Sequence, residues 1–161
     1  CSHEHKDHGA REMVTLTGKP VSLQVEELPT FHDPEQGALR GTNIIRIFTA
    51  EGLRVAHLGD LGCDLTPEQA EKLQGLDALM IPVGGYYTID ARQAKALADA
   101  LRPRVVIPMH YRGASFGYEV TGPLEDYLAL CGGENVVHYS GNTLELTADT
   151  PAQTAVLTYQ P

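Results

Sequence analysis

The chain has 161 residues, of which 42% are hydrophobic and 20% are charged, and its formal net charge is −9. This length and composition predict one folded domain and exclude a disordered chain. The acidic balance, without any cluster of Lys and Arg, argues against nucleic acid as a partner. The apolar runs are far shorter than the ~18 residues that a membrane-spanning helix needs, so we expect no membrane span.

Short runs rich in Val, Ile and Leu predict strands along most of the chain. They lie at residues 21–28, 43–48, 53–58, 78–83, 105–109, 135–139, 143–146 and 154–159. The short polar connections at 50–52 and 140–142 each predict a hairpin.

Three helices are predicted from their start signals. Thr66 opens a capping box, Asp90 precedes a helical repeat of apolar residues, and Gly122 with Pro123 begins the third helix. The expected stop signals are Gly75, Pro103 and the pair Gly132–Gly133. Strand–helix alternation flanked by hairpins indicates an α/β (α+β) protein with helices packed on mixed sheets.

The cysteines are few and far apart. Cys1, Cys63 and Cys131 form no Cys-x-x-Cys pair, which excludes a zinc ribbon and a thioredoxin-type motif. A sparse, odd count is typical of a reducing compartment, and we therefore expect a cytoplasmic protein.

The most informative segment places three imidazoles and a carboxylate within six positions. These residues are His3, His5, Asp7 and His8. A tight loop can turn all of them inward, and imidazole nitrogen with carboxylate oxygen suits zinc, manganese or iron. Four such groups exceed what one open site needs, which favours two ions. A surface cluster or an expression tag is the alternative, but tags are usually homopolymers.

Three later residues lie beside predicted strands. Asp60 and His110 follow the strands expected at 53–58 and 105–109, and His32 lies in a loop before the strand at 43–48. Open α/β sheets build their sites at the carboxyl ends of strands. One such residue alone is more often structural, but together with the first cluster all three become candidate ligands. His57 points to the same strand end and is interpreted as a supporting or core residue.

These residues, in this order, resemble the metallo-β-lactamase-fold hydrolase superfamily. The segments 57–62, 81–85 and 107–111 look most like small bacterial hydrolases related to ascorbate-6-phosphate lactonases and N-acyl-phosphatidylethanolamine phospholipase D. The resemblance implies a four-layer αβ/βα fold and a hydrolase with two divalent ions, zinc first and manganese or iron as alternatives. A hydroxide bridging the ions would attack an ester, lactone or phosphodiester bond of a small molecule.

The resemblance also implies a role for each position. The first metal would take His3, His5 and His32. The second would take Asp7, His8 and His110. Asp60 would bridge both ions, and Asp7 would orient the hydroxide or pass a proton to the leaving group.

Two other functions stay open on the same residues. One is an iron-binding redox or sensor protein, although related flavodiiron proteins carry Glu where this chain has His5, which favours hydrolysis. The other is a non-catalytic binding module, against which the complete ligand set argues. The redox or sensor protein can be told from the hydrolase, because bound iron would give a visible absorption band whereas zinc would not.

Substrate contacts are expected at the loops after two strands. Tyr86 and Tyr87 could donate hydrogen bonds, with packed aromatics in a turn as the alternative. Tyr111 and Arg112 follow His110, and Arg112 could hold an anionic group or simply be solvated. A homo-oligomer is possible on this fold.

The start of the chain gives one more expectation. The resembled family places several strands before its His-rich loop, and here almost nothing precedes it. We therefore expect residues 1–161 to be a single metallo-hydrolase domain that is truncated at its amino terminus.

Overall fold

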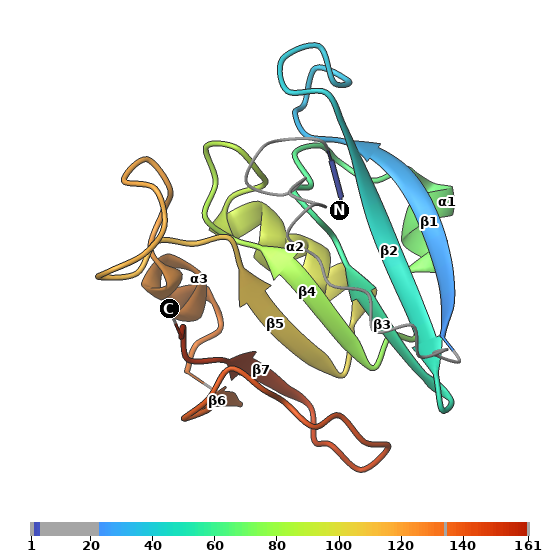
Figure 1. The fold of residues 1–161 in the computed structure, drawn as a ribbon, viewed down its shortest axis with the longest axis vertical. Coiled ribbons are helices and arrows are strands. Elements are labelled where there is room, and N and C mark those ends of the chain that lie inside the picture. Colours follow the sequence, from blue (N-terminus) through green and yellow to red (C-terminus); the bar gives the residue numbers. More distant parts are fainter. Residues whose placement is uncertain (1, 4–22, 134, 161) are drawn as a thin grey trace, which may run out of the picture.

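A mixed sheet of seven strands organises the described part of the computed structural model, residues 2–3, 23–133 and 135–160 (Figure 1). The spatial order of the strands is β1-β2-β3-β4-β5-β7-β6. Their bounds are β1 Gln24–Phe31, β2 Thr42–Ala50, β3 Leu53–His57, β4 Ala78–Pro82, β5 Val105–Met109, β6 Val136–His138 and β7 Gln153–Val156. β1, β2 and β3 pair antiparallel, and β3, β4, β5, β7 and β6 pair parallel.

Three helices begin where the sequence predicts them. They are α1 Pro67–Lys72, α2 Ala91–Leu101 and α3 Leu124–Leu130. Thr66 and Asp90 each form a complete capping box, which satisfies backbone N–H groups that have no partner within a helix. Figure 1 shows α1 and α2 behind the sheet, and α3 packs against α2. The mixed sheet with its helices confirms the α/β class. No helix among the described residues is both long and apolar enough to cross a membrane.

Side chains alternate between two faces of the sheet. On the helix side, Leu79 and Ile81 belong to the main core, together with residues of α2 and α3 such as Leu101 and Tyr127. On the other face, Ala78 belongs to a smaller apolar cluster. This alternation is the period-two pattern of a strand, and it anchors the central strands so that their carboxyl ends are held at fixed places.

The hairpin predicted at 50–52 is confirmed. Ala50 pairs with Leu53 across an antiparallel ladder, and the two turn residues Glu51 and Gly52 have φ of 52° and 78°. Positive φ at both central positions is what a two-residue hairpin with the native strand twist requires.

The second predicted hairpin is wrong. β6 and β7 run parallel, and β7 lies between β5 and β6. Residues 143–146 form no strand; instead Leu144 and Leu146 pack on the small apolar cluster of the sheet. Alternating leucines can therefore cover a sheet face without joining its hydrogen-bonded ladder. The first predicted strand begins at Gln24, and residues 21–22 of that prediction lie outside the described residues.

Candidate metal centre

Three imidazoles surround one carboxylate oxygen at the carboxyl edge of the sheet. The Nε2 atoms of His3, His32 and His110 lie 3.5, 3.3 and 3.5 Å from Oδ2 of Asp60. The rings of His3 and His32 are 4.8 Å apart. We call these four residues the Asp60 centre. His32 follows β1, Asp60 follows β3 and His110 follows β5.

The Asp60 centre fits a divalent metal ion. His3, His32 and Asp60 are 8%, 2% and 5% exposed, and their candidate ligand atoms all lie within 4.8 Å of one another. A neutral imidazole has a lone pair on one ring nitrogen that it can give to a metal ion. Nitrogen and oxygen donors of these types suit zinc, manganese or iron.

A buried amide positions the turn that carries Asp60. The side chain of Asn43, which is 0% exposed, accepts a hydrogen bond from the Asp60 N–H at 2.9 Å. Its Nδ2 donates to the carbonyl of Leu58 and to Oγ1 of Thr30, both at 2.9 Å. Asn43 thereby ties the turn to β1 and to the end of β3, and fixes the backbone of the carboxylate.

Close backbone packing further shapes the same turn. Gly59 has a φ of 59°, and a Cβ there would collide with the Asn43 side chain and lie 2.7 Å from Cβ of Ser2. His57 contributes by accepting a hydrogen bond from the Gly59 N–H at its Nδ1, at 3.0 Å. Ser2 also orients its neighbour, because its Oγ lies 2.8 Å from Nδ1 of His3. Such contacts fix how an imidazole presents its other nitrogen.

The loop that follows His32 is built around a buried carboxylate. Both oxygens of Asp33 accept backbone N–H groups, from residues 35, 37, 39 and 40. Burial raises the pKa of Asp33, but the four donors outweigh it and the pKa lies below its usual value. The loop closes where the His32 N–H donates to the Gly41 carbonyl at 3.0 Å. Gly62 packs so closely on His32 that a Cβ would strike its carbonyl.

His110 has a strained backbone. Its φ of 54° lies in the left-handed region, which is uncommon for a residue with a side chain and costs roughly 1–3 kcal/mol. Gly84, at the end of β4, packs against the His110 carbonyl with no room for a Cβ. Strain of this kind is held by the surrounding structure and concentrates at functional sites.

The structure brings together four of the seven residues that the sequence singled out as ligands. His3, His32, Asp60 and His110 converge, whereas His5, Asp7 and His8 lie outside the described residues. Among the expected substrate contacts, Tyr86 and Tyr87 are neighbours whose rings meet edge to face at 4.7 Å.

The two residues after His110 have internal contacts. Tyr111 packs edge to face on Phe116, and burial raises the pKa of its phenol. The Nε of Arg112 donates to the carbonyl of Thr121 at 3.1 Å. Arg112 thus helps to fold the loop that it lies in.

Several residues near the centre were missed by sequence reasoning. Asn43 and Asp33 act through tertiary contacts, and Arg40 and Tyr118 meet Tyr87 from two other loops. Asp33 alone carried a signal, since it follows His32 and precedes a run rich in turn residues. Nothing in the local sequence pattern marks the other three.

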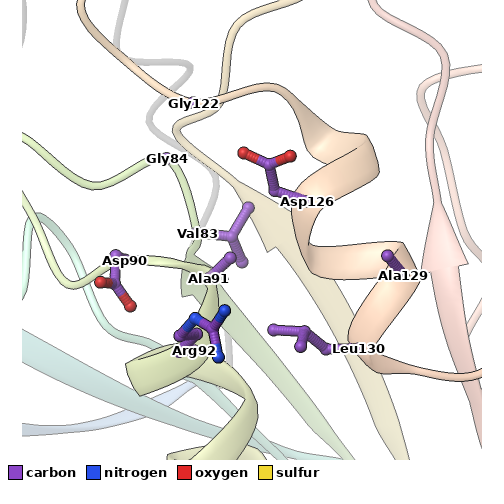
Figure 2. A pocket seen from close by; sticks show the side chains of 9 residues that line it. All are labelled: Val83, Gly84, Asp90, Ala91, Arg92, Gly122, Asp126, Ala129 and Leu130. Carbon is purple, nitrogen blue, oxygen red and sulfur yellow. The ribbon is translucent and has the colours of Figure 1, made fainter.

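A cleft of about 390 Å³ lies between the start of α2 and the length of α3 (Figure 2). It shares Gly84 with the packing around His110, but none of the four residues of the Asp60 centre lines it. Its lining is formed by Val83, Gly84, Asp90, Ala91, Arg92, Gly122, Asp126, Ala129 and Leu130.

Comparison with known proteins gives a consistent family. The profile of the beta-lactamase superfamily domain matches residues 1–110. A UPF0173 metal-dependent hydrolase from Archaeoglobus fulgidus is 31% identical over 101 residues, covering 59% of this chain and 44% of that protein. A UPF0173 protein from Pyrococcus furiosus is 41% identical over 140 residues, covering 68% of this chain and 64% of that protein.

The fold is similar to that of a solved structure. A candidate Zn-dependent hydrolase of the metallo-β-lactamase superfamily from Thermotoga maritima superimposes with a TM-score of 0.70 at 38% identity. The match covers 84% of this chain and 64% of that one. The chain therefore spans less than two thirds of the length of each of these relatives.

Proposed function

The chain belongs to the metallo-β-lactamase superfamily, and we propose that its protein is a hydrolase holding two divalent ions around Asp60. The observation that carries this proposal is the convergence of three imidazole Nε2 atoms on one buried carboxylate oxygen. The names of its relatives in Archaeoglobus and Thermotoga support a metal-dependent hydrolase.

The ligands divide into two sets in this proposal. His3, His5 and His32 would hold the first ion, and Asp7, His8 and His110 would hold the second. Asp60 would serve both ions, since its carboxylate has two oxygens and its Oδ2 lies among imidazoles from three separate segments. Zinc is the first candidate metal because histidine and aspartate are among its usual ligands.

When bound, such ions lower the pKa of a water and stabilise negative charge that develops on the substrate. The chain's own residues then hold the reacting groups in place. Asn43 and Gly59 fix the Asp60 carboxylate, and the Asp33-braced loop fixes His32. Asp7 orients the attacking group or passes a proton to the leaving group. Tyr86, Tyr87, Tyr111 and Arg112 lie on loops beside these elements and contact the substrate.

The bond that is cleaved is an ester, a lactone or a phosphodiester of a small molecule. All three have an electrophilic centre and an oxygen leaving group, so the same centre can act on each.

Metal analysis followed by a substrate panel tests this function. The purified protein is reconstituted separately with zinc, manganese and iron, and its metal content is measured after removal of unbound ions. We expect close to two ions per chain and hydrolysis of at least one substrate in a panel of esters, lactones and phosphodiesters. Protein that binds no ion after reconstitution would contradict the proposal. A coloured, iron-loaded protein with oxygen-dependent turnover would replace it by the redox alternative.

A further inference from the structure

Four side chains from three loops form an aromatic rim, which we define as Arg40, Tyr86, Tyr87 and Tyr118. The ring of Tyr87 is the middle of this group. It meets Tyr86 edge to face at 4.7 Å and Tyr118 at 6.0 Å, and the Arg40 guanidinium carbon lies 5.7 Å from its centroid. The loops follow β1, β4 and β5, along one edge of the sheet (Figure 1).

The first of these loops links the rim to the Asp60 centre. Arg40 precedes Gly41, whose carbonyl accepts the N–H of His32 at 3.0 Å. The backbone N–H of Arg40 also donates to Asp33, the residue after His32, at 2.7 Å. The guanidinium therefore extends from a backbone position that is fixed relative to His32.

The other two loops are joined to each other and to His110. Tyr86 and Tyr87 follow Gly84, which packs on the His110 carbonyl. The Gly84 carbonyl accepts the N–H of Gly122 at 2.6 Å, and the Tyr118 carbonyl accepts the N–H of Thr121 at 3.0 Å. The backbone of the rim loops is thus connected to the residues that carry His32 and His110.

Ordinary packing does not account for the rim. Tyr86 and Tyr118 are 62% and 58% exposed, so neither ring contributes a buried face to the core. Tyr86 also has a φ of 59°, a strained conformation for a bulky residue. Exposed aromatic rings that are gathered in one place, one of them on a strained backbone, are typical of a surface that meets a ligand.

The positive charge of Arg40 favours a ligand with an anionic group. Arg40 makes no ion pair with any carboxylate of the described residues, although the chain as a whole has a net charge of −9. A guanidinium over an aromatic ring at an exposed position gains about 0.5–1 kcal/mol from that contact, which leaves its hydrogen-bond donors available for an anion.

We propose that the aromatic rim binds an aromatic group of an anionic substrate, with the ring placed against Tyr87 and Tyr118 and the anionic oxygen facing Arg40. This proposal rests on the proposed hydrolase function, and it narrows the substrate to an aryl ester of an acidic group, such as an aryl phosphodiester. Rings in offset or edge-to-face contact gain about 0.5–1.5 kcal/mol beyond their buried area.

Two inhibitors test the preference directly. Phenyl phosphate and methyl phosphate have the same charge and differ in whether the group on the phosphate is aryl or methyl. With the zinc-loaded full chain hydrolysing bis(4-nitrophenyl) phosphate, we expect an inhibition constant for phenyl phosphate that is about three- to tenfold lower than that for methyl phosphate, the range that corresponds to ring contacts. Equal inhibition constants would overturn the proposal.

Variants of the rim residues test whether the preference for an aryl group comes from the rim. Tyr118→Ala removes an exposed ring and should abolish the preference for phenyl phosphate over methyl phosphate. Arg40→Lys keeps the charge but not the planar guanidinium, and should retain more binding of both anions than Arg40→Gln. Val137→Ala is the control, because Val137 is 41% exposed on the edge strand β6 and outside the rim. An aryl preference that persists in Tyr118→Ala would contradict the assignment.

A binding measurement separates failure of the rim from failure of the catalytic proposal. Isothermal titration of metal-free protein with phenyl phosphate and with methyl phosphate needs no turnover. Tighter binding of phenyl phosphate that is lost in Tyr118→Ala supports the rim, even when no substrate is hydrolysed. Hydrolysis without any preference for phenyl phosphate over methyl phosphate, in inhibition or in binding, would support the hydrolase function and refute the rim.

Discussion

The two edges of the parallel part of the sheet each place an aspartate among basic side chains, but in different ways. At the amino edge, Asp77 accepts a hydrogen bond from the Arg54 N–H at 2.7 Å and pairs with the Arg104 guanidinium at 2.5 Å. At the carboxyl edge, the imidazoles around Asp60 lie 3.3–3.5 Å from its Oδ2. Asp77 therefore has a permanent cation beside it, whereas the three imidazoles beside Asp60 are charged only if protonated.

The surroundings of Asp77 stabilise the fold, whereas those of Asp60 are strained and closely packed. Arg104 also donates to the carbonyls of Thr147, Ala148 and Thr150, so one cation fastens a whole loop to the sheet. The Asp60 edge instead has a strained His110 and glycines that allow close contacts. The comparison indicates that the amino edge stabilises the fold, and that the carboxyl edge gives up some stability to hold reactive groups.

The largest effect is expected from removing the central carboxylate. Asp60→Ala should lower kcat/KM by about a hundredfold to a thousandfold or more, because in the proposed site both ions would lose a shared ligand. Its stability without metal should change little, since the backbone N–H of residue 60 keeps its hydrogen bond to Asn43. Turnover kinetics and urea unfolding measure the two effects. Activity that survives the substitution would refute the bridging role of Asp60.

The next effect is expected from the amide that positions Asp60. Asn43→Ala leaves the Asp60 N–H and the Leu58 carbonyl without their partner, so we expect a loss of about 1–3 kcal/mol in the free energy of unfolding. Metal affinity should fall by about 10- to 100-fold, as for other residues that orient a ligand. Zinc titration checks this, with the exposed Asn142→Ala as control. Loss of stability at unchanged zinc affinity would make Asn43 a purely structural residue.

A smaller effect, on stability alone, is expected at the amino edge. Partial burial by itself raises the pKa of Asp77, but the hydrogen bonds from Arg54 and Arg104 and their charges outweigh it, so the pKa lies below its ordinary value of 3.8. A carboxyl whose pKa is lowered by folding stabilises the protein above that ordinary value, and the contribution is lost as the pH falls through the folded-state pKa.

Asp77→Asn tests that assignment. The variant should lose about 1–3 kcal/mol of unfolding free energy at pH 7. The gap from the original protein should narrow as the pH falls below about 4. Zinc affinity and turnover should not change. Unfolding curves recorded between pH 3 and 7 measure this, and a gap that stays constant over that range would show that the charge of Asp77 is not what stabilises the edge.

The smallest effect is expected far from both edges. Lys95 and Asp99 form an (i, i+4) pair on α2, and Lys95→Ala should cost only about 0.3–0.5 kcal/mol. Thermal unfolding with added salt checks this, because salt screens an exposed pair. A larger cost would mean that the helix contributes more to the fold than its surface contacts indicate.

Helix starts and the tight hairpin were predictable because they depend on residues close together in the sequence. Thr66 and Asp90 begin helices because their side chains cap them, and residues 51–52 form a hairpin because their φ values suit the turn. The insertion of β7 between β5 and β6 was not predictable, since it depends on partners far apart in sequence.

The candidate ligands were also predictable from their places in the sequence, whereas the residues that act through tertiary contacts were not. Asp60 and His110 were found because the carboxyl ends of strands carry the sites of open sheets. His32 was found as a loop residue whose place in the order of ligands matches the resemblance. Asn43 was missed because its role comes from three hydrogen bonds across strands. Tyr118 was missed because its contact with Tyr87 joins two loops.

The central claim is that the carboxyl edge binds metal and the amino edge does not. Zinc titration of the original protein, Asp60→Asn and Asp77→Asn, under one set of conditions, tests it most directly. We expect close to two zinc ions per chain in the original protein and in Asp77→Asn, and a large loss of affinity or stoichiometry in Asp60→Asn. Unchanged zinc binding in Asp60→Asn, or its loss in a folded Asp77→Asn protein, would contradict the account.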